Sequence, residues 1–199
     1  MKLFSLKIAV ISGVVLIVGG LAVVVPSLYY HYQQVNAKPA PLVLHNGQPA
    51  TQAVNQEVKT YGTPVSISIP SVDISDNVIP GVYNTSTREW TLTLDKAQFA
   101  TISTLPNPTA GDTYIYGHYR PEVFAYLHVI KPGALATVNT NKGYQFTYRF
   151  DTSRVTSPSD TSVFNYSGPA IMTLQTCTGA FFQNRQLFTF NYVSYQKLT

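Results

Sequence analysis

Three side chains of this sequence, a thiol, an imidazole and a guanidinium, lie at or near the ends of predicted β-strands. Cys177, the only cysteine, closes an alternating apolar run that begins at Ala170. His118 follows Gly117, whose missing side chain permits a close backbone approach, and Arg185 directly precedes another alternating run. Cysteine-dependent acyl transfer needs a thiolate that attacks a carbonyl, an imidazole that protonates the leaving amine and a guanidinium that stabilises the oxyanion.

A lone thiol on the oxidising side of a membrane is an inert buried side chain, half of an intermolecular disulfide, or a reactive nucleophile. If residues 170–177 form a strand, Cys177 shares the more polar face with Thr173 and Gln175. A hairpin from Cys177 to Arg185 then brings a guanidinium close to the thiol. We therefore favour the nucleophile. The plainer alternatives for His118 and Arg185 are a hydrogen-bonded residue at a strand end and a solvated hairpin residue.

Alternation with period two dominates the chain from about residue 61 onward and predicts a mainly β domain. Gly143 follows Asn141 and Lys142 between two such runs, which predicts a hairpin with glycine in the left-handed conformation. Strands at this spacing in a small domain favour a barrel or a sandwich. The clearest alternating segments are 65–69, 90–94, 113–117, 144–148 and 188–192.

Two segments break this alternation, and we predict short helices for both. In residues 95–104, Phe99 and Ile102 have the spacing of one helical face. In residues 121–130 an apolar stripe follows Pro121, which suits a first helical turn.

The N-terminal segment differs in composition from the rest of the chain. Lys2 and Lys7 precede an uncharged apolar run, 8–25, that is long enough to cross a bilayer as a helix. We therefore predict an uncleaved signal anchor over 1–26, rather than a cleaved signal peptide, with its N-terminus in the cytoplasm. Residues 27–60 have little hydrophobic periodicity and are predicted to form an extracellular stalk. Residues 61–199 then form one compact domain.

Charge and metal-ligand spacing exclude several classes of function. The formal net charge is +4, but only 11% of residues are charged and no basic run exists, which argues against a nucleic-acid partner. No cluster of histidine and cysteine has metal-ligand spacing, and no glycine-rich phosphate loop is present. Residues 152–169 contain a single acid, Asp160, so no clear calcium site is expected. We expect no metal and no cofactor.

The motifs around these residues resemble the sortase family. Thr173-Leu174-Gln175-Thr176-Cys177 matches the sortase signature TLxTC, and Arg185 lies where the family's arginine follows the cysteine. Gly117-His118, followed by Phe124-Ala125-Tyr126-Leu127 and Lys131-Pro132-Gly133, is similar to the segment around the family's histidine. The similarity covers most of residues 61–195. Two departures, Tyr119 after the histidine and Gly133-Ala134 in place of Gly-Asp, leave the subclass open.

The resemblance implies an eight-stranded sortase β-barrel and a membrane-anchored transpeptidase on the extracellular face. Such enzymes cleave secreted proteins at a C-terminal Leu-Pro-X-Thr-Gly-like sorting signal and hold them as a thioacyl intermediate. They then transfer them to an amine, such as a peptidoglycan precursor or a pilin lysine. Carried over, Cys177 is the nucleophile, His118 the general acid and base, and Arg185 the oxyanion-stabilising residue.

Three further residues are candidates for substrate binding. Thr176, beside the nucleophile, is placed to contact the bound carbonyl. Tyr119 and Phe181 are aromatic residues close to the predicted cleft and are candidates to line a groove. Two alternatives remain: a hydrolytic processing cysteine peptidase, and a non-catalytic extracellular β-domain used for binding or adhesion.

Overall fold

The computed structural model describes residues 60–87 and 89–199. The predicted anchor, 1–26, and all but the last residue of the predicted stalk, 27–60, lie outside the described residues and remain predictions. Among the residues that are described, no helix is both long enough and apolar enough to span a membrane.

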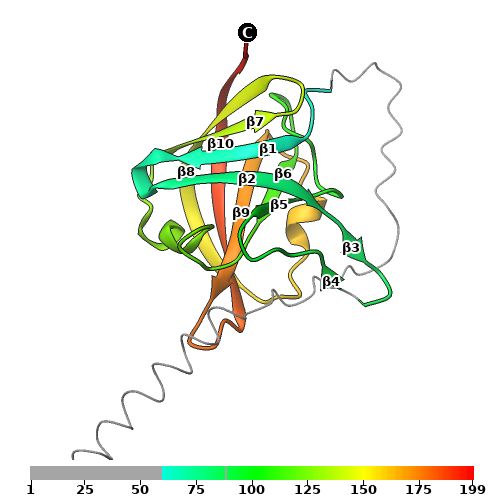
Figure 1. The fold of residues 1–199 in the computed structure, drawn as a ribbon, viewed down its shortest axis with the longest axis vertical. Helices are drawn as coiled ribbons and strands as arrows, with labels where there is room; N and C mark the ends of the chain where they lie inside the picture. Colours follow the sequence, from blue (N-terminus) through cyan, green and yellow to red (C-terminus); the bar gives the residue numbers. More distant parts are fainter. Residues whose placement is uncertain (1–59, 88) are drawn as a thin grey trace, which may run out of the picture. The chain divides into compact units, whose positions relative to one another are not determined.

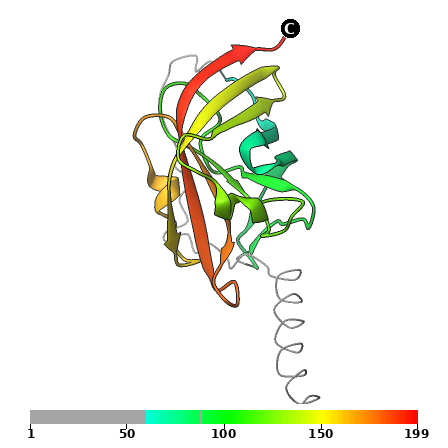
Figure 2. The same cartoon turned by 90° about the vertical axis from the view of Figure 1, so that its left-hand side faces the viewer.

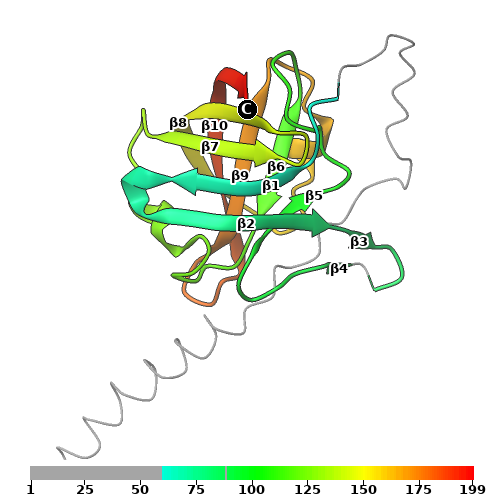
Figure 3. The same cartoon turned by 45° about the horizontal axis from the view of Figure 1, so that its top comes forward.

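Eight strands close into a barrel in the order β1-β2-β5-β6-β9-β10-β8-β7 (Figure 1). The eight strands are β1 (Pro64–Ile69), β2 (Ile74–Gly81), β5 (Ala97–Ala100), β6 (Asp112–Tyr116), β7 (Leu135–Thr140), β8 (Tyr144–Thr156), β9 (Ile171–Thr178) and β10 (Asn184–Lys197). A separate ribbon is made by β3 (Tyr83–Asn84) and β4 (Glu89–Trp90), and it extends beyond the end of β2 (Figure 3). Three short 3-10 helices complete the described domain: η1 (Pro70–Val72), η2 (Ala125–Val129) and η3 (Ser162–Asn165). The eight-stranded barrel confirms the predicted fold class for the described domain.

Strand pairing determines which strand ends lie together at one edge of the barrel. The pairs β2–β5 and β6–β9 are parallel, and the other barrel pairs are antiparallel. Because β6 and β9 are parallel neighbours, their C-terminal ends lie at the same edge. β10 returns from that edge beside β9. The loops that follow β6 and β9, and the start of β10, therefore converge there.

The barrel interior is filled by large apolar side chains from alternating strand positions. Leu174 and Met172 of β9 are fully buried in it, together with Phe188 and Phe190 of β10. Intervening residues point to the outer face, where a second apolar cluster forms around Trp90, Tyr114 and Tyr116.

The predicted hairpin at Asn141 to Gly143 is present and joins β7 to β8. Gly143 has φ 73°, the left-handed conformation that glycine adopts without a Cβ penalty. The alternating segments around 65–69, 113–117, 144–148 and 188–192 are all strands, whereas only Glu89–Trp90 of the segment near 90–94 is extended in a ladder.

The predicted helix over 95–104 is wrong, because this segment contains β5. Phe99 faces the core as expected, but Ala97 to Ala100 pair with β2, Gln98 and Phe99 also pair with β6, and Ile102 is 48% exposed. The strand has only four residues, too few for alternation to reveal it. The helix predicted over 121–130 is shorter and tighter than expected, since it is the 3-10 helix η2. Its apolar stripe is buried as predicted: Val123, Phe124, Leu127 and Ile130.

The segment between β8 and β9, residues 157–170, carries η3 and lies over the outer face of the barrel (Figure 2). It leaves β8 near the edge that carries Arg185 and returns to the far end of β9. Backbone bonds fix its far end, where Gly111 N–H donates to Gly168 O at 2.9 Å and Ile171 N–H donates to Gly111 O at 3.0 Å.

Candidate active site

The register of β9 and β10 places Cys177 directly opposite Arg185. The inner face of β9 is apolar, whereas Thr173, Gln175 and Cys177 face outward, as the alternation predicts. The two charge-bearing groups interact electrostatically, since the Arg185 guanidinium favours the thiolate form of Cys177. The structure therefore confirms that the hairpin brings the guanidinium to the thiol.

His118 reaches the same edge through the parallel pairing of β6 with β9. The last paired residues are Tyr116 and Gln175, and Gly117 N–H continues the ladder by donating to Gln175 O at 3.0 Å. Continuing this register by two residues from Tyr116 places His118 level with Cys177. A Cβ on Gly117 would lie 2.6 Å from Cγ1 of Val123, so only glycine permits the chain to pass here. The structure thus brings His118, Cys177 and Arg185 to one edge.

The guanidinium of Arg185 is buried and retains unused donors. Its Nη1 donates to the backbone oxygens of Phe182 at 3.1 Å and Asn184 at 2.9 Å. Within the described structure, Nε and Nη2 are buried without a hydrogen-bond partner. Burial lowers the pKa of Arg185 from its ordinary value, and Cys177 and Tyr114 oppose that effect. Because arginine stays protonated in proteins, these donors are available to an anion that forms beside the thiol.

The thiol of Cys177 is held in a closed, dry setting. Cys177 is 1% exposed and His118 is 3% exposed. Burial raises the pKa of Cys177, and the positive charge of Arg185 only partly offsets this rise. This rise in the pKa favours the thiol form of the cysteine. Thr176, beside it, is also buried, and its hydroxyl has no hydrogen-bond partner within the described structure.

The loop between β9 and β10 covers this edge with an aromatic contact that the sequence did not predict. Phe181, the predicted groove residue, is 64% exposed, whereas Phe182 is 6% exposed and its ring lies 5.8 Å from that of Tyr119. The backbone of Phe182 has φ 55°, which is unusual for a non-glycine residue and turns its ring inward. That conformation has no sequence signal. Tyr119 therefore contacts this loop through Phe182, and the role of Tyr119 and Phe181 in lining a substrate groove stays a prediction.

A line of polar contacts continues from this edge along the outer face of β6 and β9. The hydroxyl of Tyr114 donates to Oε1 of Gln175, and the hydroxyl of Thr173 donates to Oδ2 of Asp112 at 2.7 Å. Over them, Phe164 of η3 stacks on Trp90 with ring centroids 5.9 Å apart. These residues were missed because each, taken singly, has the pattern of an ordinary strand or loop residue.

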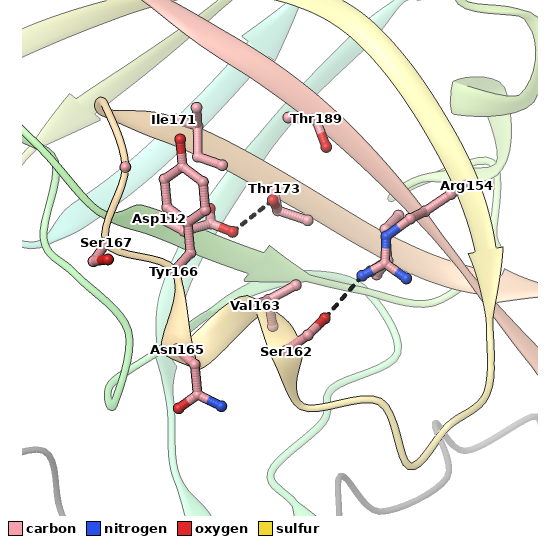
Figure 4. A pocket seen from close by; sticks show the side chains of 12 residues that line it. Asp112, Arg154, Ser162, Val163, Asn165, Tyr166, Ser167, Ile171, Thr173 and Thr189 are labelled. Atoms are coloured by element: carbon pink, nitrogen blue, oxygen red, sulfur yellow. Dashed lines mark hydrogen bonds between the residues drawn. The ribbon is translucent and has the colours of Figure 1, made fainter.

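A cavity of about 580 Å³ lies between the η3 segment and this outer face (Figure 4). It does not include the thiol, but Leu187, which lines it, is only two residues from Arg185 on β10. No group of three or more metal-ligating acids, histidines or cysteines occurs in residues 60–87 and 89–199.

Comparison with known proteins identifies the family. Residues 67–199 match the sortase domain. The chain belongs to the sortase family. The motif resemblance found in the sequence is thereby confirmed, and the family is one of cysteine transpeptidases.

Solved sortase structures share this fold. Sortase A of Listeria monocytogenes is 22% identical, with a TM-score of 0.56 over 69% of this chain and 92% of that one. Sortase C-3 of Streptococcus pneumoniae is 24% identical, with a TM-score of 0.55 over 86% of this chain and 82% of that one. Sortase E1 of Streptomyces coelicolor, solved with a tripeptide in its active site, is 22% identical, with a TM-score of 0.54 over 69% and 93% of the two chains. No curated protein matches this sortase by sequence.

Proposed function

We propose that this sortase cleaves secreted proteins at a Leu-Pro-X-Thr-Gly-like signal and transfers them to an amine on the outer side of the cell membrane. The observation that carries the proposal is the strand register, which pairs Cys177 with Arg185 and brings His118 level with both. These are the three groups that acyl transfer through a thioester needs. A peptide substrate is consistent with the structure of Streptomyces coelicolor sortase E1, which holds a tripeptide in its active site.

In the proposed reaction the sulfur of Cys177 attacks the carbonyl carbon of the substrate threonine. The thiol proton passes to His118, and the oxyanion is stabilised by Nε and Nη2 of Arg185, which have no other partner among the described residues. His118 then protonates the leaving glycine amine as the C–N bond breaks. The acceptor amine reverses these steps: it attacks the thioester, loses a proton to His118 and releases the thiol.

The burial of the thiol favours transfer over hydrolysis. Cys177 is 1% exposed, and Phe182 of the loop that follows β9 is 6% exposed and contacts Tyr119. A covered site limits the access of water to the thioester, which would otherwise be lost by hydrolysis. The acceptor is then an amine that enters after the leaving peptide, and a peptidoglycan precursor or a pilin lysine fits this requirement. The predicted anchor, 1–26, would hold the domain near both donor and acceptor.

The test is intact-mass spectrometry of the full chain in detergent micelles, incubated with peptides that contain Leu-Pro-X-Thr-Gly. We expect a mass increase equal to the peptide up to threonine, which disappears in Cys177→Ala and is discharged faster by an added amine than by water. His118→Ala should also abolish the adduct, whereas His128→Ala, a histidine on η2, serves as its matched control. A folded, reduced chain that forms no adduct with any such peptide would favour a binding or adhesion role, and discharge by water alone would favour a processing peptidase.

A further inference from the structure

The cavity beneath the η3 segment contains a buried acid that the proposed reaction does not use. Asp112, the first residue of β6, is 3% exposed and lines both this cavity and a smaller one of about 230 Å³ on the other side of the segment. Tyr166 lines both as well, and Figure 4 shows it in front of Asp112. The acid therefore lies at the base of the space covered by the η3 segment.

The carboxylate of Asp112 is only half satisfied. Its Oδ2 accepts a hydrogen bond from the hydroxyl of Thr173 at 2.7 Å. Its Oδ1 is buried and has no hydrogen-bond partner within the described structure. A buried carboxylate oxygen without a partner is costly, and such a cost is offset when a ligand supplies the missing donor.

No described cation neutralises this acid. Arg154 is the only basic residue that lines either cavity, and its Nη1 already pairs with Asp160 at 2.7 Å while Nη2 donates to Ser162 at 3.0 Å. Burial raises the pKa of Asp112 to about 6, against the opposing effect of its bonds to Thr173. Above this pKa the carboxylate is ionised, and no basic side chain that lines either cavity is then free to pair with it.

We propose that this cavity is a subsite for the ammonium or guanidinium group of a basic side chain in the peptide substrate, with Asp112 as its counter-ion. This subsite rests on the proposed transpeptidase function. The ring of Tyr166 lines the cavity and adds an aromatic face, which attracts such cations. A charge-assisted hydrogen bond to Oδ1 satisfies the oxygen that lacks a partner.

The distance from the thiol identifies which substrate supplies the cation. Asp112 pairs with Ile171, six residues before Cys177 on β9, a separation of roughly 20 Å at about 3.3 Å per residue. An acceptor amine bound at Asp112 is too far away to attack the thioester. An extended donor peptide with its scissile carbonyl at Cys177 covers this distance in about six residues, and a lysine side chain shortens it. The basic residue therefore lies about five or six positions before the scissile bond, just outside the proposed signal, or about four to six positions after it.

The test compares donor peptides that differ at one position, lysine against norleucine, placed five or six residues before the scissile bond, outside the Leu-Pro-X-Thr-Gly signal, or four, five or six residues after it. With the full chain in micelles, we expect kcat/KM to be about tenfold higher for lysine at one of these positions, as one charge-assisted contact provides. In Asp112→Asn the lysine-to-norleucine ratio should fall toward one. Asp73→Asn is the matched control, because Asp73 is exposed at φ 53°, a conformation that asparagine tolerates, and it should keep the ratio. A ratio near one at every position in the unsubstituted enzyme would overturn the subsite.

A binding measurement separates this subsite from the catalytic proposal. Peptide binding to the Cys177→Ala chain, followed by fluorescence anisotropy, requires no chemistry and should show the same lysine preference and its loss in Cys177→Ala/Asp112→Asn. The n-butylammonium ion, with n-butanol as the neutral control, should shift the NMR signals of Thr173 and Tyr166 only when Asp112 is present. A lysine preference without any thioacyl adduct would retain the subsite and reject the reaction. Adducts without Asp112-dependent binding of lysine or butylammonium would do the reverse.

Discussion

The two faces of β9 are buried to nearly the same extent but are built from different chemistry. On the inner face, Met172 and Leu174 are both 0% exposed among apolar side chains. On the outer face Thr173, Gln175 and Cys177 are between 1% and 4% exposed, yet they lie among acids, phenols and a guanidinium. Burial therefore does not distinguish the face that holds the fold from the face that holds the site.

The faces differ in how well their polar atoms are satisfied. Among the described residues, the outer face holds buried atoms without hydrogen-bond partners on Asp112 and Arg185, whereas on the inner face such atoms are the hydroxyl of Tyr148 and, at the edge beside Cys177, the hydroxyl of Thr176. Unsatisfied buried groups reduce stability, and they persist where a ligand or a transition state uses them. Alternation along one strand thus separates stabilising residues from functional ones.

Substitution on the inner face should break the fold without touching the chemistry. Leu174→Ala removes a fully buried side chain and leaves a cavity in the barrel, so we expect the free energy of unfolding to fall by about 2–5 kcal/mol. Cys177→Ala, three residues later on the opposite face, should cost less stability while abolishing the thioacyl adduct. Urea unfolding of both variants checks this contrast. Equal losses of stability would mean that the two faces are not separated as described.

Substitution of Arg185 should affect the chemistry of the outer face directly. Arg185→Gln removes the positive charge opposite Cys177, and we expect kcat/KM to fall about 10²–10³-fold through loss of oxyanion stabilisation. Since Arg185 lowers the pKa of the thiol against the larger effect of burial, its removal raises that pKa further. The pH dependence of iodoacetamide alkylation of Cys177 should therefore move to higher pH.

Arg185→Lys separates charge from geometry. Lysine keeps the charge but not the planar fork of donors, so it should leave the alkylation curve near its original pH while still reducing kcat/KM. An alkylation curve that moves equally in both variants would show that burial, rather than charge, controls the thiol.

Much of this arrangement can be predicted from the sequence, and the reason is the period of the strands. Alternation from Ala170 to Cys177 correctly assigns each side chain to a face, and the hairpin between Cys177 and Arg185 follows from the short loop between two such runs. His118 is likewise predicted at a strand end, and the motif resemblance favours the barrel over the sandwich. Local pattern and global fold agree at these positions, as they do in foldable sequences.

The parts that could not be predicted depend on contacts between distant segments or on single backbone angles. The strand β5 is predicted as a helix because its four residues, all buried, are too few to show a clear period. Phe182 turns inward only because its φ is 55°, and Asp112 is notable only because Thr173 satisfies one of its oxygens and nothing described satisfies the other. Residue type alone predicts none of these features.

The unsatisfied acid of the outer face should make stability depend on pH. The pKa of Asp112 is raised to about 6 by burial, above its ordinary value near 3.9 in the unfolded chain. The folded protein then binds the proton more tightly than the unfolded chain does. The contribution of Asp112 to the free energy of unfolding is therefore greatest below about pH 4 and falls as the pH rises to about 6, by at most about 3 kcal/mol.

Asp112→Asn should remove this part of the pH dependence. Urea unfolding between pH 4 and 7 measures it, with Asp73→Asn as the control that retains the slope. If both variants lose stability as the pH rises, as the unsubstituted chain does, the ionisation of Asp112 is not the cause of this pH dependence.

The smallest effect concerns the cover over the site, and it distinguishes two adjacent aromatic residues. Phe182 is 6% exposed and its ring contacts Tyr119, whereas Phe181 is 64% exposed. Phe182→Ala should open a path to the thiol and increase the rate of Cys177 alkylation several-fold, while Phe181→Ala should leave that rate nearly unchanged. The same opening admits water, so Phe182→Ala should also raise the fraction of thioacyl enzyme lost to hydrolysis instead of transfer. If alkylation instead responds to Phe181, the loop over the outer face has a different conformation in solution from the one described. The outer face would then not be closed to water, and only the barrel interior would be.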